Sequence, residues 1–304
     1  MKLHQLQALV ASIDHGGIRA AARMLNISQA AVTKALRQLE DEAGLPLLQR
    51  RSRGIGLTPA GERAVQRARL VLRQIELTED DWQQTRGHDH GSIHIGVTPY
   101  VTLTVLGDAF AWFRQRYQQV QVHIIDGLMS RTLPRLRDGS LDWALVAADP
   151  GEVPSKEFTM QHVVRVRQRV AARQGHRIFL DPSPEALSAC EWAHTGPIAD
   201  APGNQHAQMF RQAGVPFPKR AVLGETLAAL SLIRHGDALG VVPEPLLGHP
   251  ESRGISPVPN TGLEPSDLDV IVLSQPDVPM TPAAAYFAHC LISCVRAGAT
   301  PTVS

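Results

Sequence analysis

The chain has 304 residues, of which 43% are apolar and 19% are charged, the balance of a folded protein with room for a buried core. No apolar run approaches the ~18 residues that a membrane-spanning helix needs, so a membrane partner is not expected. The net charge of +1 hides an asymmetry, because residues 1–75 carry twelve Lys and Arg against five Asp and Glu, a net +7, which leaves −6 for the remainder. The basic N-terminal part has the sign that contacts to phosphate require.

The first 17 residues predict an amphipathic helix rather than a secretion signal. Leu3, Leu6, Leu9, Val10 and Ile13 recur at helical spacing and are expected to point inward. The segment lacks both a long apolar region and a cleavage site. Three cysteines in a chain of this length favour a reducing compartment, so we expect a cytoplasmic protein.

Residues 18–43 predict two short helices joined by a tight turn. Ser28 is a good N-cap for the second helix, because its hydroxyl can accept a hydrogen bond from a first-turn amide. The outer face of that helix keeps donors, acceptors and positive charge, as a helix that enters a major groove needs. An ordinary helix pair with a solvated polar face is the alternative. The predicted buried stripe is Val32, Leu36, Leu39 and Ala43, and the outer face is Gln29, Thr33, Lys34, Arg37 and Gln38.

A short arginine-containing loop at 44–57 follows, and a long helical pattern then runs from Thr58 to about Arg86. Thr58 is the predicted N-cap, and Pro59 suits the first helical position. A helix of this length extends on the order of 40 Å and needs a cover for its apolar stripe. Packing against its own domain is one option, but we favour antiparallel pairing with the same helix of a second subunit. The residues expected at that contact are Val65, Ala68, Leu72 and Ile75.

Residues within the first sixty positions form one specific pattern. It consists of Ala20-Ala21-Ala22, Leu25, Ser28-Gln29, Ala31-Val32, Leu39-Glu40, Gly44, Pro46-Leu47-Leu48, Arg50 and Leu57-Thr58-Pro59-Ala60-Gly61. This pattern resembles the N-terminal domain of LysR-type transcriptional regulators. Departures from it at Ala30, Thr33, Leu48 and Gly17-Ile18 remove no polar group from the expected DNA face, so they bear on sequence preference more than on DNA binding.

The resemblance implies a multidomain protein that begins with an all-α winged helix-turn-helix domain at residues 1–58. A linker and dimerisation helix at 59–86 and a glycine-flanked hinge at 87–91 would follow. The three arginines of the loop would hold the phosphate backbone, while polar residues of the second helix would contact base edges or nearby phosphates. The DNA-binding residues expected in this way are Ser28, Gln29, Thr33, Lys34, Arg37, Arg50, Arg51 and Arg53.

After residue 91 the chain changes to alternating strands and helices, a pattern of parallel strands with right-handed crossovers. A first α/β set is followed by a less legible stretch, a second α/β set, a late strand and a last helix. The predicted strands are 92–97, 120–126, 141–147, 163–172, 190–194, 220–223, 239–243 and 267–273, and the predicted helices are 101–117, 131–138, 204–213, 225–235 and 282–296.

Two α/β lobes in tandem resemble the effector-binding domain of the same family, which is like a periplasmic solute-binding protein. The stretches at 138–145 and 236–243 are typical of that domain. The resemblance therefore covers nearly the whole chain, although it is weaker after residue 90. It implies an effector-binding domain at 92–304, with lobe I at about 92–162 and 267–304 and lobe II at about 163–266.

A ligand in such a domain is expected beyond the carboxyl ends of the strands, where helix N-termini offer free amides. Hydroxyls and amides of these loops could hold a small anion while apolar side chains contact its body. Helix capping is an equally good explanation for Thr98, Ser130 and Thr226, and the two roles are compatible. The expected effector-binding residues are Thr98, Tyr100, Val101, Thr102, Met129, Ser130, Thr132, Thr195, Gly196, Glu225, Thr226 and Val242.

Motifs of catalysis and of cofactor or metal binding are missing from the sequence. His88 and His90 in the expected hinge read as solvated side chains rather than metal ligands. Cys290 and Cys294 lie one helical turn apart and could form a thiol switch, but small apolar core residues are the simpler reading. We therefore expect neither an enzyme nor a bound cofactor or metal.

The sequence as a whole predicts a LysR-type regulator that binds double-stranded promoter DNA and responds to a small organic acid, for which an aromatic carboxylate or sulfonate is one option. The resemblance implies a homodimer through the linker helix, a homotetramer, and contact with RNA polymerase. A redox-sensing regulator of the same family is the second hypothesis. A ligand-binding protein or an enzyme with an accessory helical domain is the third.

Overall fold

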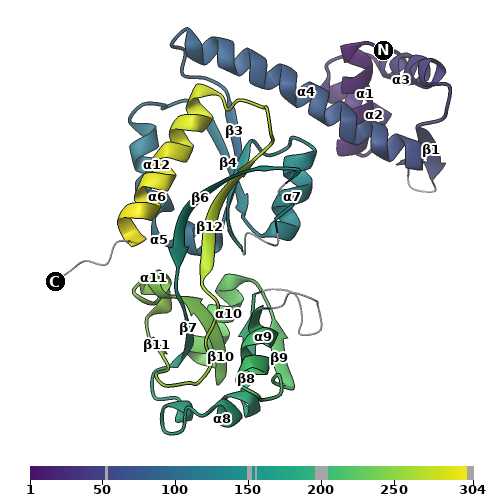
Figure 1. Cartoon of the computed structure of the whole chain (residues 1–304). Helices are drawn as coiled ribbons and strands as arrows, with labels where there is room; N and C mark the ends of the chain where they lie inside the picture. The colour runs from purple at the N-terminus through teal and green to yellow at the C-terminus, as the bar shows by residue number, and fades with distance from the viewer. Residues whose placement is uncertain (52–53, 149–152, 155, 196–204, 300–304) are drawn as a thin grey trace.

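The computed structural model describes residues 1–51, 54–148, 153–154, 156–195 and 205–299. A small helical domain at the N-terminus, one long helix and two α/β lobes follow one another along the chain (Figure 1). Within the described residues, no helix is both long and apolar enough to cross a bilayer. The N-terminal part consists of α1 (Leu3–Asp14), α2 (Ile18–Met24), α3 (Gln29–Ala43), β1 (Leu48–Arg51), β2 (Gly54–Leu57) and α4 (Pro59–Thr85).

The N-terminal domain has its own core, in which α1, α2 and α3 pack against the first part of α4. Ser28 caps α3, because its side chain accepts a hydrogen bond from the Ala31 amide at 3.1 Å. The predicted buried stripe of α3 is correct except at its end, where Ala43 is exposed and Ala35 is buried instead. Leu3 was also expected to point inward but is exposed, because it is the first residue of α1 and lies beyond the core.

The segment predicted as a loop contains an antiparallel hairpin. Leu48 pairs with Leu57 and Arg51 with Gly54 in β1 and β2, which form the wing of the domain. Thr58 joins the base of this wing to α4, since its hydroxyl donates to the Pro46 carbonyl at 2.8 Å and accepts from the Gly61 amide at 3.0 Å.

α4 is shared between two parts of the same chain. Val65 and Ala68, expected at a subunit contact, are instead buried in the N-terminal core, and Leu72 packs at the edge of that core. Further along, Arg73, Asp80 and Gln84 bond to lobe I. Packing against its own chain therefore covers much of the apolar surface that was assigned to a second subunit.

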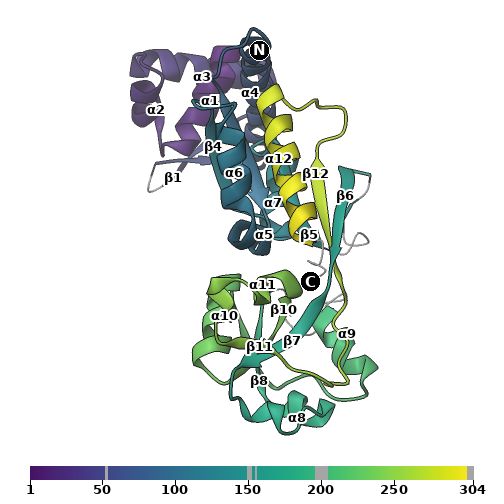
Figure 2. The same cartoon turned by 90° about the vertical axis from the view of Figure 1, so that its left-hand side faces the viewer.

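Lobe I is a five-stranded sheet in the order β4-β3-β5-β12-β6, with α6 and α12 on one face and α7 on the other (Figures 1 and 2). β4, β3 and β5 are parallel as predicted, whereas β12 runs antiparallel to both of its neighbours, β5 and β6. Its elements are β3 (Ser92–Val97), α5 (Pro99–Thr104), α6 (Leu106–Arg114), β4 (Gln121–Asp126), α7 (Met129–Arg137), β5 (Trp143–Ala148), β6 (Thr159–Val166), β12 (Leu268–Ser274) and α12 (Pro282–Ala299).

Lobe II repeats this plan in a second sheet, ordered β11-β7-β10-β8-β9, in which β10, β8 and β9 are parallel. β7 and β11 complete it in antiparallel fashion. Its elements are β7 (Gln168–Arg173), a 3-10 turn (Arg177–Phe179), α8 (Pro184–Ala189), β8 (Glu191–His194), α9 (Gln205–Gln212), β9 (Arg220–Leu223), α10 (Thr226–His235), β10 (Ala238–Pro243), α11 (Glu244–Leu247), a 3-10 turn (Pro250–Ser252) and β11 (Ile255–Pro257).

The main difference from the predicted elements lies where the chain crosses between the lobes. The single strand predicted at 163–172 is two strands, because β6 ends in lobe I at Val166 and β7 begins in lobe II at Gln168. Lobe I therefore extends past residue 162. The helix predicted at 101–117 is likewise two helices, α5 and α6, which meet at Val105.

Candidate DNA-binding surface and effector cavity

The outer face of α3 is a shallow, polar and basic surface. Gln29, Lys34 and Arg37 are exposed, and within the described residues neither cation forms an ion pair. Thr33 is half-buried and donates its hydroxyl to the Gln29 carbonyl at 2.9 Å, so it can offer a base only an acceptor. The Ser28 hydroxyl accepts a hydrogen bond from the Ala31 amide as the helix cap. Gln29, Lys34 and Arg37 are therefore free to donate to DNA, and the exposed Ser28 hydroxyl also keeps its proton for donation.

The wing contacts α1 and α4 in the N-terminal domain, and in Figure 1 it projects from the end of the domain where α4 begins. Arg50 and Arg51 are on strand β1, opposite Ile55 and Gly54. Arg53, the third arginine predicted to contact the backbone, lies outside the described residues.

A cavity of about 810 Å³ lies between the two lobes. Strand ends and helix starts from both lobes form its walls. None of the residues that precede α5, α7 and α10 makes a side-chain capping bond to its helix. First-turn amides and hydroxyls are thus available near the cavity to hold an anion. Of the predicted residues, Thr98, Tyr100, Met129, Ser130, Thr195, Glu225, Thr226 and Val242 line it.

Three predicted effector residues do not line this cavity. Val101 is fully buried in the core of lobe I. The hydroxyl of Thr102 donates to the carbonyls of Val97 and Thr98, and Thr132, also fully buried, donates to the Leu128 carbonyl at 3.0 Å. These two threonines satisfy their hydroxyls inside their own segments. Gly196, also predicted, falls outside the described residues.

Sequence reasoning missed several residues of the cavity. Gln168 lines it because the chain crosses from lobe I to lobe II there, a crossing hidden by reading β6 and β7 as one strand. His206 lines it from the start of α9, and no local pattern marked that position. The other missed contributors are mainly apolar, and they include Leu128, Leu223, Leu230, Val241 and Leu246.

Charges around the cavity are few. Glu225 is the only Asp, Glu, Lys or Arg among the described residues that line it, and it forms an ion pair across the lobes with Arg131 of α7. Burial, with a smaller effect of His194, lowers the pKa of His206 to about 4. Burial also lowers the pKa of His194, whose Nδ1 lies 2.8 Å from that of His206. At neutral pH this histidine pair is uncharged, so an anion would depend on amides and hydroxyls.

The three cysteines are poorly placed for redox chemistry. Cys190 and Cys290 are buried, and Cys294 is half-buried. Burial raises the pKa of all three thiols, which disfavours the reactive thiolate. Cys190 belongs to lobe II, whereas Cys290 and Cys294 lie one turn apart on α12 of lobe I. Among the described residues, no group of three or more His, Cys, Asp or Glu side chains is placed to hold a metal ion.

A winged helix-turn-helix joined by a long helix to a two-lobed domain with an interlobe cavity defines a DNA-binding regulator that carries its own sensor domain. Comparison with known families agrees with this class. The family described as "LysR substrate binding domain" matches residues 86–293, and "Bacterial regulatory helix-turn-helix protein, lysR family" matches residues 3–62. The chain belongs to the LysR family of transcriptional regulators, DNA-binding proteins that are not enzymes, as the sequence predicted.

Individual relatives are distant. The HTH-type transcriptional regulator PcaQ of Agrobacterium fabrum is 27% identical over 293 residues, 92% of each chain. The DNA-binding transcriptional dual regulator OxyR of Escherichia coli is 31% identical over 147 residues, 48% of each chain. CbnR, a LysR family regulator, has a similar fold, with a TM-score of 0.66 and 19% identity over 99% of this chain and all of that one. CbnR has also been solved with its target DNA, at the same TM-score and 20% identity, over 97% of this chain and all of that one.

Proposed function

We propose that this protein binds promoter DNA as a homo-oligomer and changes its activity when a small organic acid occupies the cavity between the lobes. An acid with an apolar body, such as an aromatic carboxylate or sulfonate, fits the lining best. The observation that carries this proposal is the joint wall of the cavity, to which lobe I contributes Thr98 and Ser130 and lobe II contributes Thr195 and Thr226. A ligand that touches both lobes favours one interlobe angle, and only such a preference can shift a conformational equilibrium.

The chemistry of the lining supports a weakly polar acid over a nucleotide or a sugar. Tyr100, Met129 and Leu230 offer apolar surface, while the described lining has no lysine or arginine. Helix N-termini can bind a carboxylate without a cationic side chain. Arg131 is paired with Glu225, which lines the cavity, and is a candidate for a second contact with the acid.

DNA binding is proposed to go through the outer face of α3 and the arginines of the wing. Supporting observations are the exposed Gln29, Lys34 and Arg37 and the net charge of +7 on residues 1–75. CbnR, whose fold is similar, is known in complex with its target DNA. Family membership further supports a cytoplasmic homotetramer that contacts RNA polymerase at the promoter.

The dimer contact is proposed on the face of α4 that the protein leaves uncovered. Val71 is 42% exposed and Trp82 60% exposed, and with the half-buried Ile75 they fall at i, i+4 and i+11 on one side of the helix. We call these three residues the α4 stripe. It replaces Val65 and Ala68, which belong to the N-terminal core.

Redox sensing is the second candidate, because OxyR of E. coli matches about half of the chain. Burial of the three thiols argues against it. The test is a variant with Cys190, Cys290 and Cys294 all replaced by alanine. We expect it to keep its transcriptional response, whereas loss of the response with unchanged folding would favour the redox reading.

The central experiment uses the full chain and DNA selected from a random pool. We expect affinity to fall steeply between about 50 and 200 mM salt, because bound phosphates release counterions. Arg51→Ala should weaken all sequences about equally, whereas Arg37→Ala and Gln29→Ala should also change the selected sequence. Equal binding by wild type and a triple Arg50/Arg51/Arg53→Ala variant would refute this part of the proposal.

A further inference from the structure

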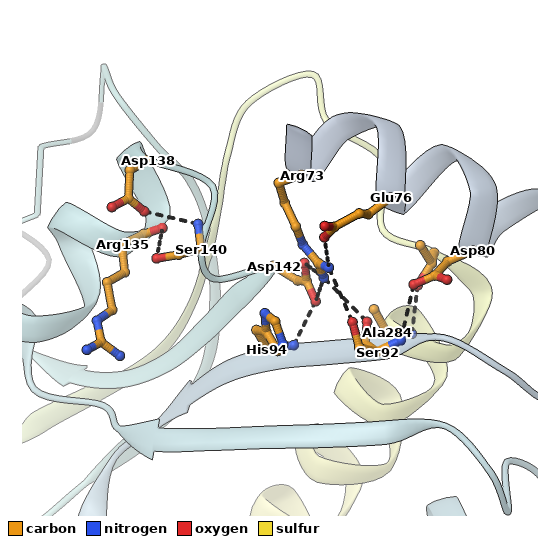
Figure 3. Close-up of polar contacts among 11 residues, drawn as sticks. Arg73, Glu76, Asp80, Ser92, His94, Arg135, Asp138, Ser140, Asp142 and Ala284 are labelled. Atoms are coloured by element: carbon orange, nitrogen blue, oxygen red, sulfur yellow. Dashed lines mark hydrogen bonds and ion pairs between the residues drawn. The ribbon is translucent and has the colours of Figure 1, made fainter. Parts of the chain in front are cut away.

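A buried ion pair joins the linker helix to lobe I. Arg73 of α4 donates from its Nη2 to Asp142 Oδ1 at 2.7 Å and Oδ2 at 3.0 Å (Figure 3). The two side chains are 6% and 4% exposed. Asp142 is itself fixed to β3, because its Oδ2 accepts from the His94 amide at 2.8 Å. Burial acts to lower the pKa of Arg73, but the charge and hydrogen bonds of Asp142 and Glu76 outweigh it and raise that pKa, so the guanidinium stays charged.

Other α4 side chains reinforce this contact along more than three turns of the helix. Asp80 Oδ2 accepts from the Ser92 amide at 3.1 Å, and Gln84 Oε1 accepts from the Ala283 amide at 2.9 Å. Leu70 lies against Gly139, where an added Cβ would come 2.9 Å from Leu70 Cδ2. Lobe I and α4 are therefore docked as one body in this structure. Residues 87–91, which were expected to be a hinge, connect two segments that these contacts already hold together.

The docked contact has two packing defects, one at Arg73 and one beside Asp142. The Nε of Arg73 is buried and has no hydrogen-bond partner among the described residues, which is costly for a guanidinium. A cavity of about 20 Å³ also remains between α4 and lobe I, lined by Leu77, Asp142 and Met280 among others. It has room for about one water molecule. A contact with such defects gains less from staying closed than a fully packed interface would.

Arg73 also has a second carboxylate partner on its own helix, which it contacts while it is bound to Asp142. Glu76 follows it at i+3, lies 3.3 Å from Arg73 Nη1 and is 62% exposed. When α4 leaves lobe I, Arg73 moves into solvent and keeps this carboxylate beside it, so its charge does not lose all compensation. Asp142 then keeps the His94 amide. Each residue of the ion pair therefore keeps one polar partner when the two separate, which lowers the cost of breaking the pair.

We propose that Arg73 and Asp142 form a latch with two positions, docked as seen here and released with Arg73 parted from Asp142 and left with Glu76 alone. In the docked position the DNA-binding domain, α4 and lobe I move together. In the released position lobe I swings about residues 87–91, and the DNA-binding domain changes its place relative to the sensor lobes. This inference rests on the α4 contact alone and not on the identity of the effector.

Two backbone amides report the position of the latch, because their acceptors are α4 side chains. The Ser92 amide donates to Asp80 and the Ala283 amide to Gln84, so both lose protection from hydrogen exchange when α4 undocks. The amide of Ala284 is the internal control, since it donates to Thr281 Oγ1 within lobe I. All three are measured in the 304-residue chain.

Asp142→Asn keeps the size of the side chain and removes its charge, which leaves Arg73 without its buried counter-ion. We expect exchange at Ser92 and Ala283 to speed up on the order of 100-fold, with the Ala284 rate unchanged. Glu76→Gln is the matched control, because it neutralises the exposed carboxylate on the same guanidinium. Exposed pairs contribute little, so exchange should stay within about twofold of wild type.

Arg73→Gln is the second variant, and it leaves every side chain of lobe I in place. It should open the contact as Asp142→Asn does. If Asp142→Asn also raises exchange at Ala284, that variant disturbs lobe I itself, and the test of the latch then depends on Arg73→Gln. Unchanged protection of Ser92 and Ala283 in Arg73→Gln would overturn the latch, as would equal loss of protection in Glu76→Gln.

Discussion

The carboxylate of Glu40 accepts a hydrogen bond from the backbone amide of Leu47 at 2.8 Å, and the same Oε1 accepts from the Leu48 amide at 3.0 Å. Glu40 lies on α3, and Leu48 opens the first strand of the wing. One side chain thus fixes the wing to the helix that is proposed to read DNA. Among the described residues, Glu40 therefore has a structural role that its acidic neighbours at the end of α3 do not share, because its carboxylate holds the wing in place.

Glu40→Ala should loosen the wing without removing any residue from the DNA face. Hydrogen bonds to a charged group contribute about 1.5–3 kcal/mol each, so we expect a stability loss of that order and DNA affinity lower by about tenfold. Thermal unfolding and gel shifts measure the two effects. Asp41→Ala is the control, since this neighbouring exposed carboxylate makes no side-chain bond among the described residues. Equal losses in both variants would mean that Glu40 acts only through its charge.

Gly61 allows α4 to start against the base of the wing. An added Cβ would come 1.9 Å from the Leu47 carbonyl oxygen, which belongs to the backbone and cannot move aside cheaply. Gly61→Ala should therefore destabilise the protein by at least the ~1–3 kcal/mol typical of overpacking. Gly107→Ala in α6 is the control, because nothing lies within 4 Å of its added Cβ. It should be neutral or stabilising by about 0.5–1 kcal/mol, as seen in the two melting temperatures.

Local chemistry made much of this fold predictable. Ser28 and Thr58 cap helices because a hydroxyl before a helical run satisfies an amide two or three positions later, and both do so here. Spacing alone also placed Val32, Leu36 and Leu39 in the core. These features depend on neighbours within a few residues, which a sequence displays directly.

Features that depend on distant neighbours were not predictable in the same way. The apolar spacing of Val65 and Ala68 predicts that both are buried but does not identify the surface that buries them. In the structure they pack in the N-terminal core, where α1 of the same chain contacts α4. In the cavity, Thr98 and Thr102 look alike in sequence, yet only the first lines the wall. Arg73 and Asp142 are far apart along the chain, so no spacing rule could pair them.

The α4 stripe should be the dimer contact. Val71→Glu/Trp82→Glu places two charges on it, and burying them against a partner without counter-ions is costly. We expect light scattering to give a smaller oligomer with unchanged helix content. Gln66→Glu/Gln83→Glu adds the same charge off the stripe and should leave the oligomer intact. A Val71/Trp82 variant that keeps its oligomeric state would place the subunit contact elsewhere.

The last prediction concerns the cavity and uses two threonines of the same segment. A thermal-shift screen of small carboxylates and sulfonates against the full chain should first find an acid that stabilises it, because any ligand that binds only the folded state raises its stability. Thr98→Val then removes a hydroxyl from the cavity wall, and Thr102→Val removes one that bonds inside its own segment.

By calorimetry we expect Thr98→Val to weaken the acid by about 5- to 10-fold, the loss of one hydrogen bond of ~1 kcal/mol or slightly more. Thr102→Val should change stability but leave affinity within about twofold. DNA affinity without the acid should stay the same in both variants, since neither residue is near the DNA face. If Thr98→Val binds the acid as tightly as wild type while Thr102→Val does not, the ligand lies outside this cavity wall, and the proposed role of the interlobe hydroxyls is wrong.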